Sequence, residues 1–346
     1  MLHNCHSNPY QPLVFANMKI GPTDIQDTFA EAFSMRYSKI TITAINQRWL
    51  ETAVNEFCGY GTSVIGCDAE VGLESWIDES ETLDGRPGAS VMMFGFSKDA
   101  VQKAAVNRVG QCLMTCPTTA VFDGFAQGDF AQSADQTKLE NPNEFKTANA
   151  ASAQPISVEK IPLGKHLRFF GDGFQKSKLI GERRFWRVPV MDGEFIVEDT
   201  IGVTKGVAGG NFLILSTDQL TGLTAAERAI DEIAKIKNVI APFPGGVVRS
   251  GSKVGSRYPS LRASTSHTFC PTLRGRVETK LPDKAGCVYE IVIDGSDFDS
   301  VADATRTGIE AAAGEGVVAI SAGNYGGKLG KHHFHLLKLF ETEPVQ

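Results

Sequence analysis

Two stretches of this chain resemble one another at a constant separation of 172 residues. Asp27 corresponds to Asp199, and each is followed by a threonine and then an apolar residue. Further along, the strand-like run 40–44 corresponds to the strand-like run 212–216 at the same separation. Equal spacing of two such pairs predicts an internal duplication, so that the chain folds as two similar halves.

Each half continues with the same order of predicted elements. Apolar residues at helical spacing follow both strand-like runs, over residues 45–57 and 226–234. The second of these helices carries a capping-box pattern at Thr224–Glu227, which predicts its start. A Gly-rich turn follows each helix, and a short strand is expected after the first turn, at residues 63–65.

A second strand–helix unit closes each half. Strands are predicted at 91–96 and 288–293, and an apolar helical stripe follows each of them. Two such units per half, with antiparallel returns, favour two related ferredoxin-like lobes of the split βαβ type over one long parallel sheet. The expected fold class is therefore α/β of the α+β kind, a pair of sandwich lobes.

The predicted domain division has three parts. Residues 1–18 form an N-terminal extension, residues 19–165 the N-terminal lobe and residues 166–346 the C-terminal lobe. The stretch 131–165 is rich in Gln, Asn, Ala, Ser and Lys and has little periodicity, so we expect a surface insertion there.

Charge and hydrophobicity exclude several classes of protein. A net charge of −6 offers no basic surface for a nucleic-acid backbone. No apolar run approaches the roughly 18–20 residues of a membrane-spanning helix. The N-terminus lacks the cationic start and apolar stretch of a secretory signal. We therefore expect a cytoplasmic protein that binds neither nucleic acid nor membrane.

Common nucleotide-binding and hydrolase motifs are absent from the sequence. Gly327-Lys328-Leu329 lacks the hydroxyl residue that a phosphate-binding loop needs for its metal ion. Gly171-Asp172-Gly173 does not continue into a dinucleotide-binding pattern, and no Gly-x-Ser-x-Gly elbow occurs. Triphosphate hydrolysis, dinucleotide chemistry and serine-hydrolase chemistry are thus unsupported.

The sequence does not favour a metal site either. The seven cysteines are odd in number and lie mostly in apolar surroundings, as reduced thiols do. Cys112 and Cys116 lack a second pair of ligands. His333 and His335 share one face of a predicted strand, but that face continues with leucines. We expect structural histidines and no bound metal.

Two features of the C-terminal half allow a functional interpretation. Glycines gather around residues 206–210, 245–246, 251–255 and 323–327, where they either form tight turns or let the backbone approach a ligand. Glu290 lies in an apolar strand, where its carboxylate is either salt-bridged or solvent-facing at an exposed strand end, or buried with a raised pKa that suits proton transfer. The residues alone favour the first alternative for Glu290.

Several ordered motifs between residues 20 and 340 resemble those of formylmethanofuran:tetrahydromethanopterin formyltransferase. They are residues 27–33, 61–65, 84–88, 169–173, 193–199, 204–212, 241–246, 252–256, 270–272, 287–293 and 320–330. The resemblance implies two α/β lobes, a homo-oligomer built as a dimer of dimers, and no tightly bound metal or prosthetic group. It also implies formyl transfer between the primary amine of a methanofuran-type carrier and N5 of a tetrahydromethanopterin-type pterin.

The chain looks like a bacterial member of this family. Its N-terminal extension, its insertion and its moderate net charge depart from the archaeal pattern. The resemblance then implies a subunit of a formyltransferase/hydrolase complex, whose metal-dependent formylmethanofuran hydrolase releases formate in C1 metabolism. Two alternatives stay open: a non-catalytic scaffold or carrier-binding subunit of that complex, and a pterin-binding module.

The resemblance also places the site. Glu290, in a motif that matches the family, is expected to transfer the proton in both directions. Substrate binding is expected at Asn211, Gly245, Gly246, Ser252, Lys253, Asn324 and Lys328. The candidate oxyanion donors are the side chains of Asn211, Ser252 and Lys253 and the backbone amides of the Gly-rich loops. Arg249 joins Lys253 and Lys328 as a candidate partner of carrier carboxylates. Cys270 is an alternative nucleophile, but its sequence neighbours are taken to offer no histidine base, so a core thiol is expected.

Overall fold

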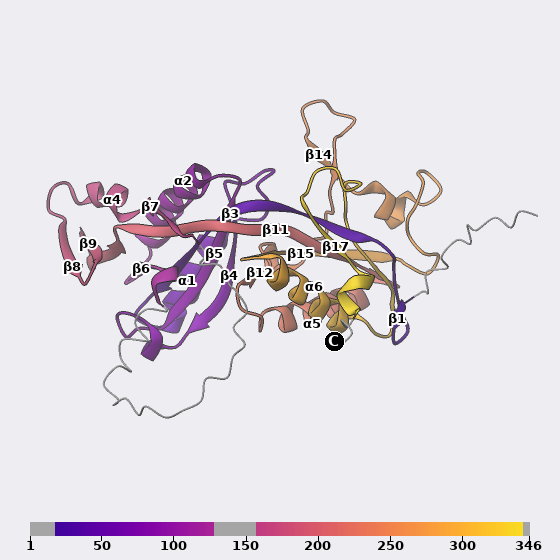
Figure 1. Cartoon of the computed structure of the whole chain (residues 1–346), viewed down its shortest axis with the longest axis horizontal. Helices are drawn as coiled ribbons and strands as arrows, with labels where there is room; N and C mark the ends of the chain where they lie inside the picture. The colour runs from indigo at the N-terminus through magenta and orange to yellow at the C-terminus, as the bar shows by residue number, and fades with distance from the viewer. Residues whose placement is uncertain (1–17, 128–156, 342–346) are drawn as a thin grey trace, which may run out of the picture.

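Two long antiparallel strands, β3 (Phe29–Thr43) and β11 (Thr200–Ser216), run side by side along the length of the molecule (Figure 1). The structure is a computed structural model that describes residues 18–127 and 157–341. The two strands pair over part of their length, with Phe33 opposite Ala208 and Tyr37 opposite Thr204. Beyond this overlap each strand continues into its own part of one large sheet.

The N-terminal half is built around β3. Its strand order is β6-β3-β5-β4, and all neighbouring strands are antiparallel. Helix α1 leads from β3 to β4, and helix α2 leads from β5 to β6. The bounds are α1 (Gln47–Cys58), β4 (Glu70–Ile77), β5 (Gly88–Gly95), α2 (Lys98–Arg108) and β6 (Ala120–Asp123), and a π-helical turn (Val109–Leu113) continues α2.

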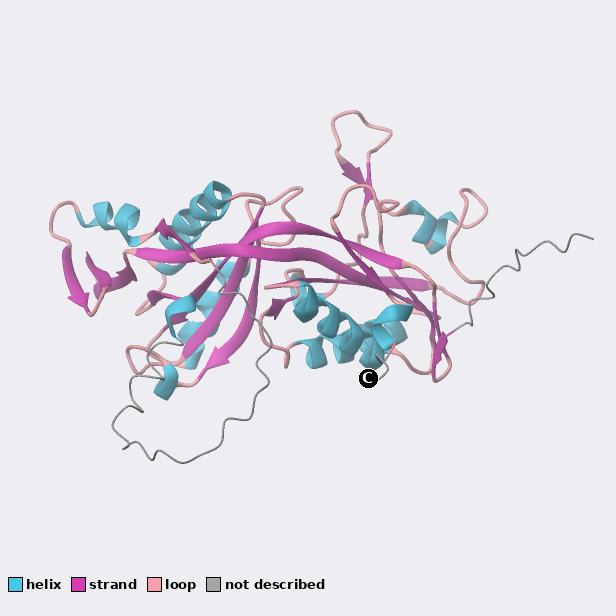
Figure 2. Ribbon diagram, in the orientation of Figure 1, coloured by secondary structure: helices cyan, strands magenta, loops and turns pink. Residues whose placement is uncertain are grey.

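The C-terminal half is built around β11. Its strand order is β16-β11-β15-β12, again antiparallel throughout. Two helices, α5 and α6, pack together against one face of these strands (Figure 2). The bounds are α5 (Gln219–Ile233), β12 (Val239–Ile240), β15 (Cys287–Gly295), α6 (Phe298–Ala312) and β16 (Val317–Ser321).

Further strands extend the sheet at its edges. β2 pairs parallel with β16, and β10 pairs parallel with β6. The hairpin of β13 and β14 projects from the body of the molecule (Figure 1). These elements are β1 (Met18–Ile20), β2 (Thr23–Ile25), β7 (Glu159–Pro162), α4 (Gly164–Leu167), β8 (Lys176–Ile180), β9 (Arg183–Val190), β10 (Gly193–Glu198), β13 (Lys253–Val254), β14 (Ala263–Ser264) and β17 (His332–His335).

The predicted mixed α/β class is confirmed, while the domain boundaries stay a prediction. The expected extension and insertion lie largely outside the described residues. The end of the insertion forms β7, whose residues pair with β11. Strands β8, β9 and β10 lie within the residues that the sequence predicts for the C-terminal lobe, but they continue the sheet next to β6 of the first half.

Local sequence signals explain most helix starts, with one error. The Asn46 side chain accepts a hydrogen bond from the Trp49 N–H and so begins α1. The capping box predicted at Thr224 is wrong, because α5 begins earlier: Asp218 accepts from the Thr221 N–H at 2.9 Å.

In the described part of the chain, no helix combines the length and apolar character that a membrane span requires.

Each half has its own hydrophobic core. In the first, Ile40 and Ile42 of β3 pack with the buried face of α1, which includes Phe57. In the second, Phe212 of β11 and Ile291 of β15 pack beneath α5 and α6. Because side chains alternate along a strand, the neighbours of Ile291 point to the opposite face of the sheet. That opposite face carries the site described below.

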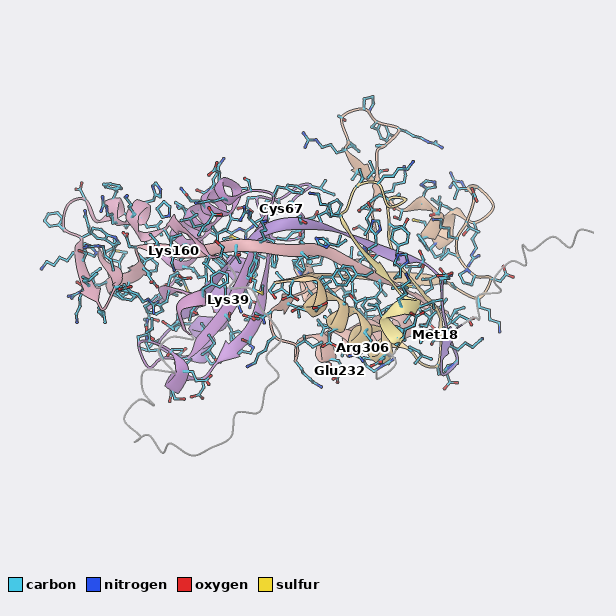
Figure 3. All side chains as sticks on the ribbon, in the orientation of Figure 1. Met18, Lys39, Cys67, Lys160, Glu232 and Arg306 are labelled. Carbon is cyan, nitrogen blue, oxygen red and sulfur yellow. The ribbon has the colours of Figure 1, made fainter. Side chains whose placement is uncertain are left out.

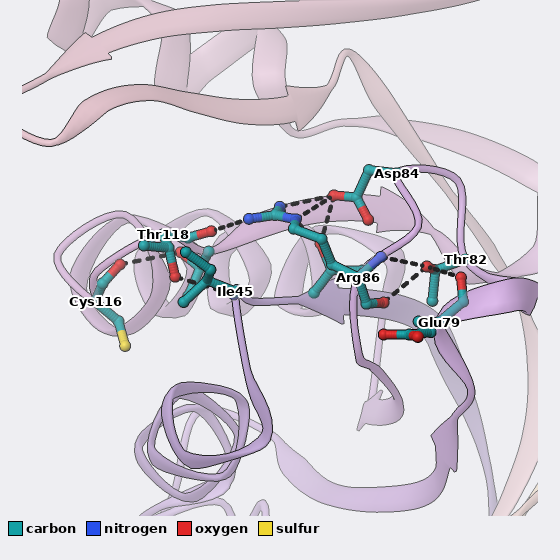
Figure 4. Close-up of polar contacts among 9 residues, drawn as sticks. Ile45, Glu79, Thr82, Asp84, Arg86, Cys116 and Thr118 are labelled. Carbon is teal, nitrogen blue, oxygen red and sulfur yellow. Dashed lines mark hydrogen bonds and ion pairs between the residues drawn. The ribbon is translucent and has the colours of Figure 1, made fainter.

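One motif quoted for the resemblance, residues 84–88, belongs to the framework of the first half. Arg86 donates to Asp84 Oδ2 at 2.7 and 2.9 Å, to Thr43 Oγ1 at 2.9 Å and to the Thr118 carbonyl (Figure 4). Thr82 Oγ1 in turn donates to the Arg86 carbonyl at 2.8 Å. This cluster ties the turn before β5 to the end of β3 and to the segment before β6.

Candidate active site

Two cavities meet at Glu290, on the sheet face away from α5 and α6. Their volumes are about 270 and 570 Å³. We call them the smaller and the larger cavity. The residues that line both are Asn211, Val248, Ser250, Gly251, Ser252, Lys253, Glu290 and Tyr325. A molecule in one cavity can therefore reach a molecule in the other at this junction.

The backbone of Glu290 is paired on both of its sides. On one side the residue pairs with Leu213 of β11, and on the other it forms a two-residue bridge with Val248. Within the described residues the Glu290 side chain makes no ion pair and is not exposed, so neither the salt-bridged nor the solvent-facing alternative describes it. Burial among protein atoms raises its pKa to about 7. Such a group can give or take a proton near neutral pH.

Positive charge gathers around the smaller cavity. Arg249, Lys253 and Lys280 all contribute to its lining. The Lys280 ammonium also lies 5.8 Å from the ring centre of Phe269. This set of cations suits a ligand that carries carboxylates.

Aromatic and aliphatic side chains dominate the larger cavity. Phe33, Phe96, Phe243 and Tyr325 stand in its wall, together with several aliphatic residues. The turn that contains Cys67, labelled in Figure 3, forms another part of the wall. The strand expected at 63–65 is wrong: these residues form this turn, and the Val64 N–H donates to a carboxyl oxygen of Glu70 instead of to a strand.

Four of the seven predicted binding residues lie around the two cavities. Ser252 and Lys253 line both. Asn211 lines both as well, but its amide is fully engaged: it donates to the Gly209 and Gly323 carbonyls at 3.3 and 3.1 Å and accepts from the Gly323 N–H at 2.6 Å. Asn324 lines the smaller cavity and donates to the Phe29 carbonyl at 3.1 Å. The two asparagines therefore fix loops rather than offer free donors.

The other three predicted residues lie elsewhere. Gly245, Gly246 and Lys328 do not contribute to the described lining of either cavity. Gly246 has a φ of 75°, and a Cβ there would lie 2.3 Å from Ile230 Cδ1 of α5, so this glycine permits a tight turn against the helix. Lys328 is exposed. At Gly245 and Gly246 the glycines therefore form a tight turn, which is one of the two alternatives that the sequence left open.

A buried carboxylate that sequence reasoning missed holds the loop after β16. Glu31 Oε2 accepts from the N–H groups of Tyr325 and Gly327 at 2.7 and 2.9 Å, and Oε1 accepts from Leu329 and Gly330 at 2.5 Å each. Burial acts to raise the pKa of Glu31, but these four backbone hydrogen bonds outweigh it, and the pKa is lowered. The loop 325–330 is thus wrapped around one anion.

Two more residues near Glu290 were missed. The Tyr325 hydroxyl is hydrogen-bonded to Ser252, and burial raises its pKa, so it stays protonated as a donor. His267 lines the smaller cavity together with Cys270. The expectation that no histidine accompanies Cys270 was therefore wrong, and the signal was present, since His267 precedes Cys270 by one helical turn. The Cys270 sulfur contacts the Ser266 carbonyl at 3.6 Å.

The histidines and cysteines considered as metal ligands are not clustered. Among residues 18–127 and 157–341, no group of three or more His, Cys, Asp or Glu is placed to hold a metal ion. The His333 ring instead packs against Phe29, with 4.9 Å between ring centres.

Comparison with known proteins identifies the family. The profile of formylmethanofuran-tetrahydromethanopterin formyltransferase matches residues 18–148 and 144–190, and the profile of the proximal lobe of this family matches residues 193–339. The formylmethanofuran–tetrahydromethanopterin formyltransferase of Methylococcus capsulatus is 48% identical over 326 residues, which cover 93% of this chain and 99% of that protein. The enzyme of the same name from Archaeoglobus fulgidus is 44% identical and is covered completely, with 93% of this chain aligned.

Two solved structures have the same fold. The formyltransferase of Methanosarcina barkeri superposes with a TM-score of 0.80 at 42% identity, covering 93% of this chain and 100% of that one. A chain of the formyltransferase/hydrolase complex from Methylorubrum extorquens, solved in complex with methylofuran, gives a TM-score of 0.81 at 41% identity, covering 94% and 99%. With profiles, relatives and structures in agreement over almost its whole length, the chain belongs to the formylmethanofuran–tetrahydromethanopterin formyltransferase family.

Proposed function

We propose that this chain transfers a formyl group between the primary amine of a methanofuran-type carrier and N5 of a tetrahydromethanopterin-type pterin. The names of its relatives support the reaction. The single observation that carries the mechanism is the position of Glu290 where two cavities meet. Each carrier occupies one cavity, and because both are held in one site, proximity supplies much of the rate.

Glu290 acts as the acid–base group. When the furan carrier's amine attacks the formyl carbon, its nitrogen must lose a proton, which the Glu290 carboxylate accepts. The resulting carboxylic acid then gives this proton to N5 of the pterin as the bond between N5 and the formyl carbon breaks. In the reverse direction the Glu290 carboxylate takes the proton from N5, and the carboxylic acid returns it to the amine as the amine leaves. A pKa of about 7 keeps both forms populated near neutral pH, so that one residue serves both directions.

The formyl oxygen becomes negative in the tetrahedral intermediate and needs hydrogen-bond donors. Tyr325 and Ser252 are suited to this task because their hydroxyls are bonded to each other beside Glu290. The backbone N–H groups of Ser250 and Gly251 are also suited, since they donate to no acceptor among the described residues. Donors fixed before the reaction stabilise developing charge without reorganisation.

The charges of the two cavities indicate which carrier each one takes. Arg249 and Lys280 line the smaller cavity and not the larger, and their charges favour the acidic tail of the furan carrier there. The aromatic wall of the larger cavity, with Phe33 and Phe243, favours the flat pterin ring.

We infer a wider context from the same observations. The matching strand orders of the two halves support a duplicated ferredoxin-like lobe. The relative from Methylorubrum extorquens, a chain of a formyltransferase/hydrolase complex, supports assembly with hydrolase subunits. The metal dependence of those subunits follows from the family resemblance, and the cytoplasmic location stays a prediction from the sequence. A homo-oligomer built as a dimer of dimers, and catalysis without a tightly bound cofactor, follow from the family resemblance.

The experiment uses the isolated chain, a formylated furan carrier and the tetrahydropterin, with transfer followed by pterin absorbance. Glu290→Gln is compared with Glu227→Gln, which changes an exposed residue of α5. We expect kcat to fall about 10²–10⁴-fold for Glu290→Gln and to stay unchanged for the control. A wild-type chain that binds both carriers without transfer would favour the scaffold alternative, and a Glu290→Gln chain of normal rate would exclude this mechanism.

A further inference from the structure

Two carboxyl groups that the mechanism does not use face one another where the halves of the molecule meet. Glu70 is the first residue of β4 in the N-terminal half, and Asp294 lies near the end of β15 in the C-terminal half. The exposed fraction of Glu70 is 6%, and that of Asp294 is zero. The strands come close here because Gly72 of β4 has no side chain: a Cβ would lie 3.0 Å from Ile240 Cβ of β12.

Each carboxyl has one oxygen bound to a backbone N–H. Glu70 Oε1 accepts from Val64 at 3.1 Å, and Asp294 Oδ1 accepts from Gly209 at 2.8 Å. Gly209 lies in an irregularity of β11, where the pairing with β15 shifts between Val207 and Gly210. The Asp294 side chain therefore takes up an N–H that the sheet leaves free.

The side chains of Glu70 and Asp294 interact with each other, and the second oxygen of each carboxyl has no other partner among the described residues. Glu70 Oε2 and Asp294 Oδ2 are buried, and among the described residues no N–H or hydroxyl group donates to either. Neither carboxyl forms an ion pair in that part of the chain, and Lys39 pairs with Glu74, further along β4. Two buried carboxylates in contact would repel strongly, whereas one proton between them makes a hydrogen bond. Burial raises the pKa of both groups, and that of Asp294 well above its usual range.

The pair also touches the site. Glu70, Val64 and Gly209 all line the larger cavity. Because side chains alternate along β15, Asp294 shares the sheet face of Glu290. The two backbone groups that the pair holds thus both belong to the lining of the larger cavity, one from each half.

We propose that Glu70 and Asp294 share one proton and that this hydrogen bond is a positioning device, which holds the Val64 and Gly209 walls of the larger cavity in register. Asp294, the more deeply buried, is the donor, and Glu70 is the acceptor. The inference goes beyond the part proposed for Glu290 and does not depend on it.

Infrared spectroscopy tests the shared proton directly. Because Glu290 itself is partly protonated near neutral pH, the comparison is made in the Glu290→Gln background, with and without Asp294→Asn. We expect the difference spectrum near neutral pH to contain the carbonyl stretch of one protonated carboxylic acid, lost with Asp294. A spectrum without this band would overturn the proposal, whether or not Glu290 proves catalytic.

Kinetics test the positioning role on the otherwise unchanged chain. Asp294→Asn keeps a donor toward Glu70, so we expect KM for both carriers within about two-fold of wild type. Asp294→Ala leaves Glu70 as a lone buried carboxylate, so we expect KM for the carrier in the larger cavity to rise about ten-fold while KM for the other changes little. If Asp294→Asn and Asp294→Ala raise this KM equally, or if neither raises it, the proposal is contradicted. If Asp294→Ala does not fold, the comparison of Glu70→Gln with Glu70→Ala gives the same test.

Discussion

Val248 and Glu290 exchange two backbone hydrogen bonds, of 2.8 and 2.9 Å, although Val248 lies outside the named strands. This bridge draws the segment after Val248 across β15, and residues 250–253 then line both cavities. The bridge therefore brings the segment that lines both cavities next to Glu290, at their junction.

Burial of Glu290 costs stability at neutral and alkaline pH. The folded chain holds the Glu290 proton more tightly than the unfolded chain, whose pKa is near 4.5. The free energy of unfolding therefore falls as pH rises from about 4.5 to about 7, by at most about 3 kcal/mol, and stays lower above that range. Glu290→Gln cannot ionise, so we expect it to match wild type at acid pH and to exceed it above neutrality. Urea unfolding of both proteins across this range measures the difference, and a constant difference would argue against the raised pKa.

Periodicity was sufficient for most of the fold. The spacing of Leu50, Ala53, Val54 and Phe57 predicted the buried face of α1, and all four are buried. It failed where a competing signal was stronger. Asp218 begins α5 before the capping box at Thr224, and the Glu70 side chain captures the N–H of Val64 where a strand was expected.

The candidate site could be predicted only in part, because its neighbours come from distant segments. The resemblance pointed to Glu290, but composition and spacing could not reveal that Glu31 binds N–H groups almost 300 residues away. Glycine-rich sequence was also ambiguous. It marked a cavity wall at Gly251 but only a turn at Gly245 and Gly246.

The anchor of the loop 325–330 is testable through Glu31→Gln. The amide presents its NH₂ group to N–H donors that now meet a carboxylate, so at least two of the four hydrogen bonds are lost. We expect a loss of roughly 2–3 kcal/mol in unfolding free energy, together with a lower kcat, because displacement of Tyr325 removes the proposed oxyanion donor. Denaturant unfolding and steady-state kinetics check this, with Glu227→Gln as the exposed control. Unchanged stability would show that the loop does not depend on this anion.

Tyr325→Phe tests the oxyanion donor. It removes the hydroxyl that bonds Ser252 but keeps the ring in the walls of both cavities. We expect kcat to fall about 10²-fold with KM nearly unchanged, because the donor acts mainly on the transition state. Initial rates over a range of both carriers separate these terms. A variant of normal kcat would leave the backbone N–H groups of Ser250 and Gly251 as the donors.

Arg86→Ala tests whether the motif at residues 84–88 is purely structural. Arg86 joins Asp84, Thr43 and the Thr118 carbonyl (Figure 4), and none of these residues lines either cavity. We expect a loss of about 1–3 kcal/mol in unfolding free energy, with kcat and KM unchanged at a temperature where the variant is folded. Thermal unfolding together with kinetics decides the matter, and a specific change in KM would instead connect this cluster to the site.

The cations of the smaller cavity should recognise charge on the furan carrier. Lys280 lines this cavity, whereas Lys284, four residues later, is exposed and does not. Lys280→Glu reverses a charge beside the expected carboxylate tail, so we expect KM for the furan carrier to rise about ten-fold at low ionic strength. The effect should shrink as salt screens the charges, and KM for the pterin should stay constant. Lys284→Glu changes the net charge equally, so equal effects of the two substitutions would mean that the charge of the whole chain, and not the smaller cavity, attracts the carrier.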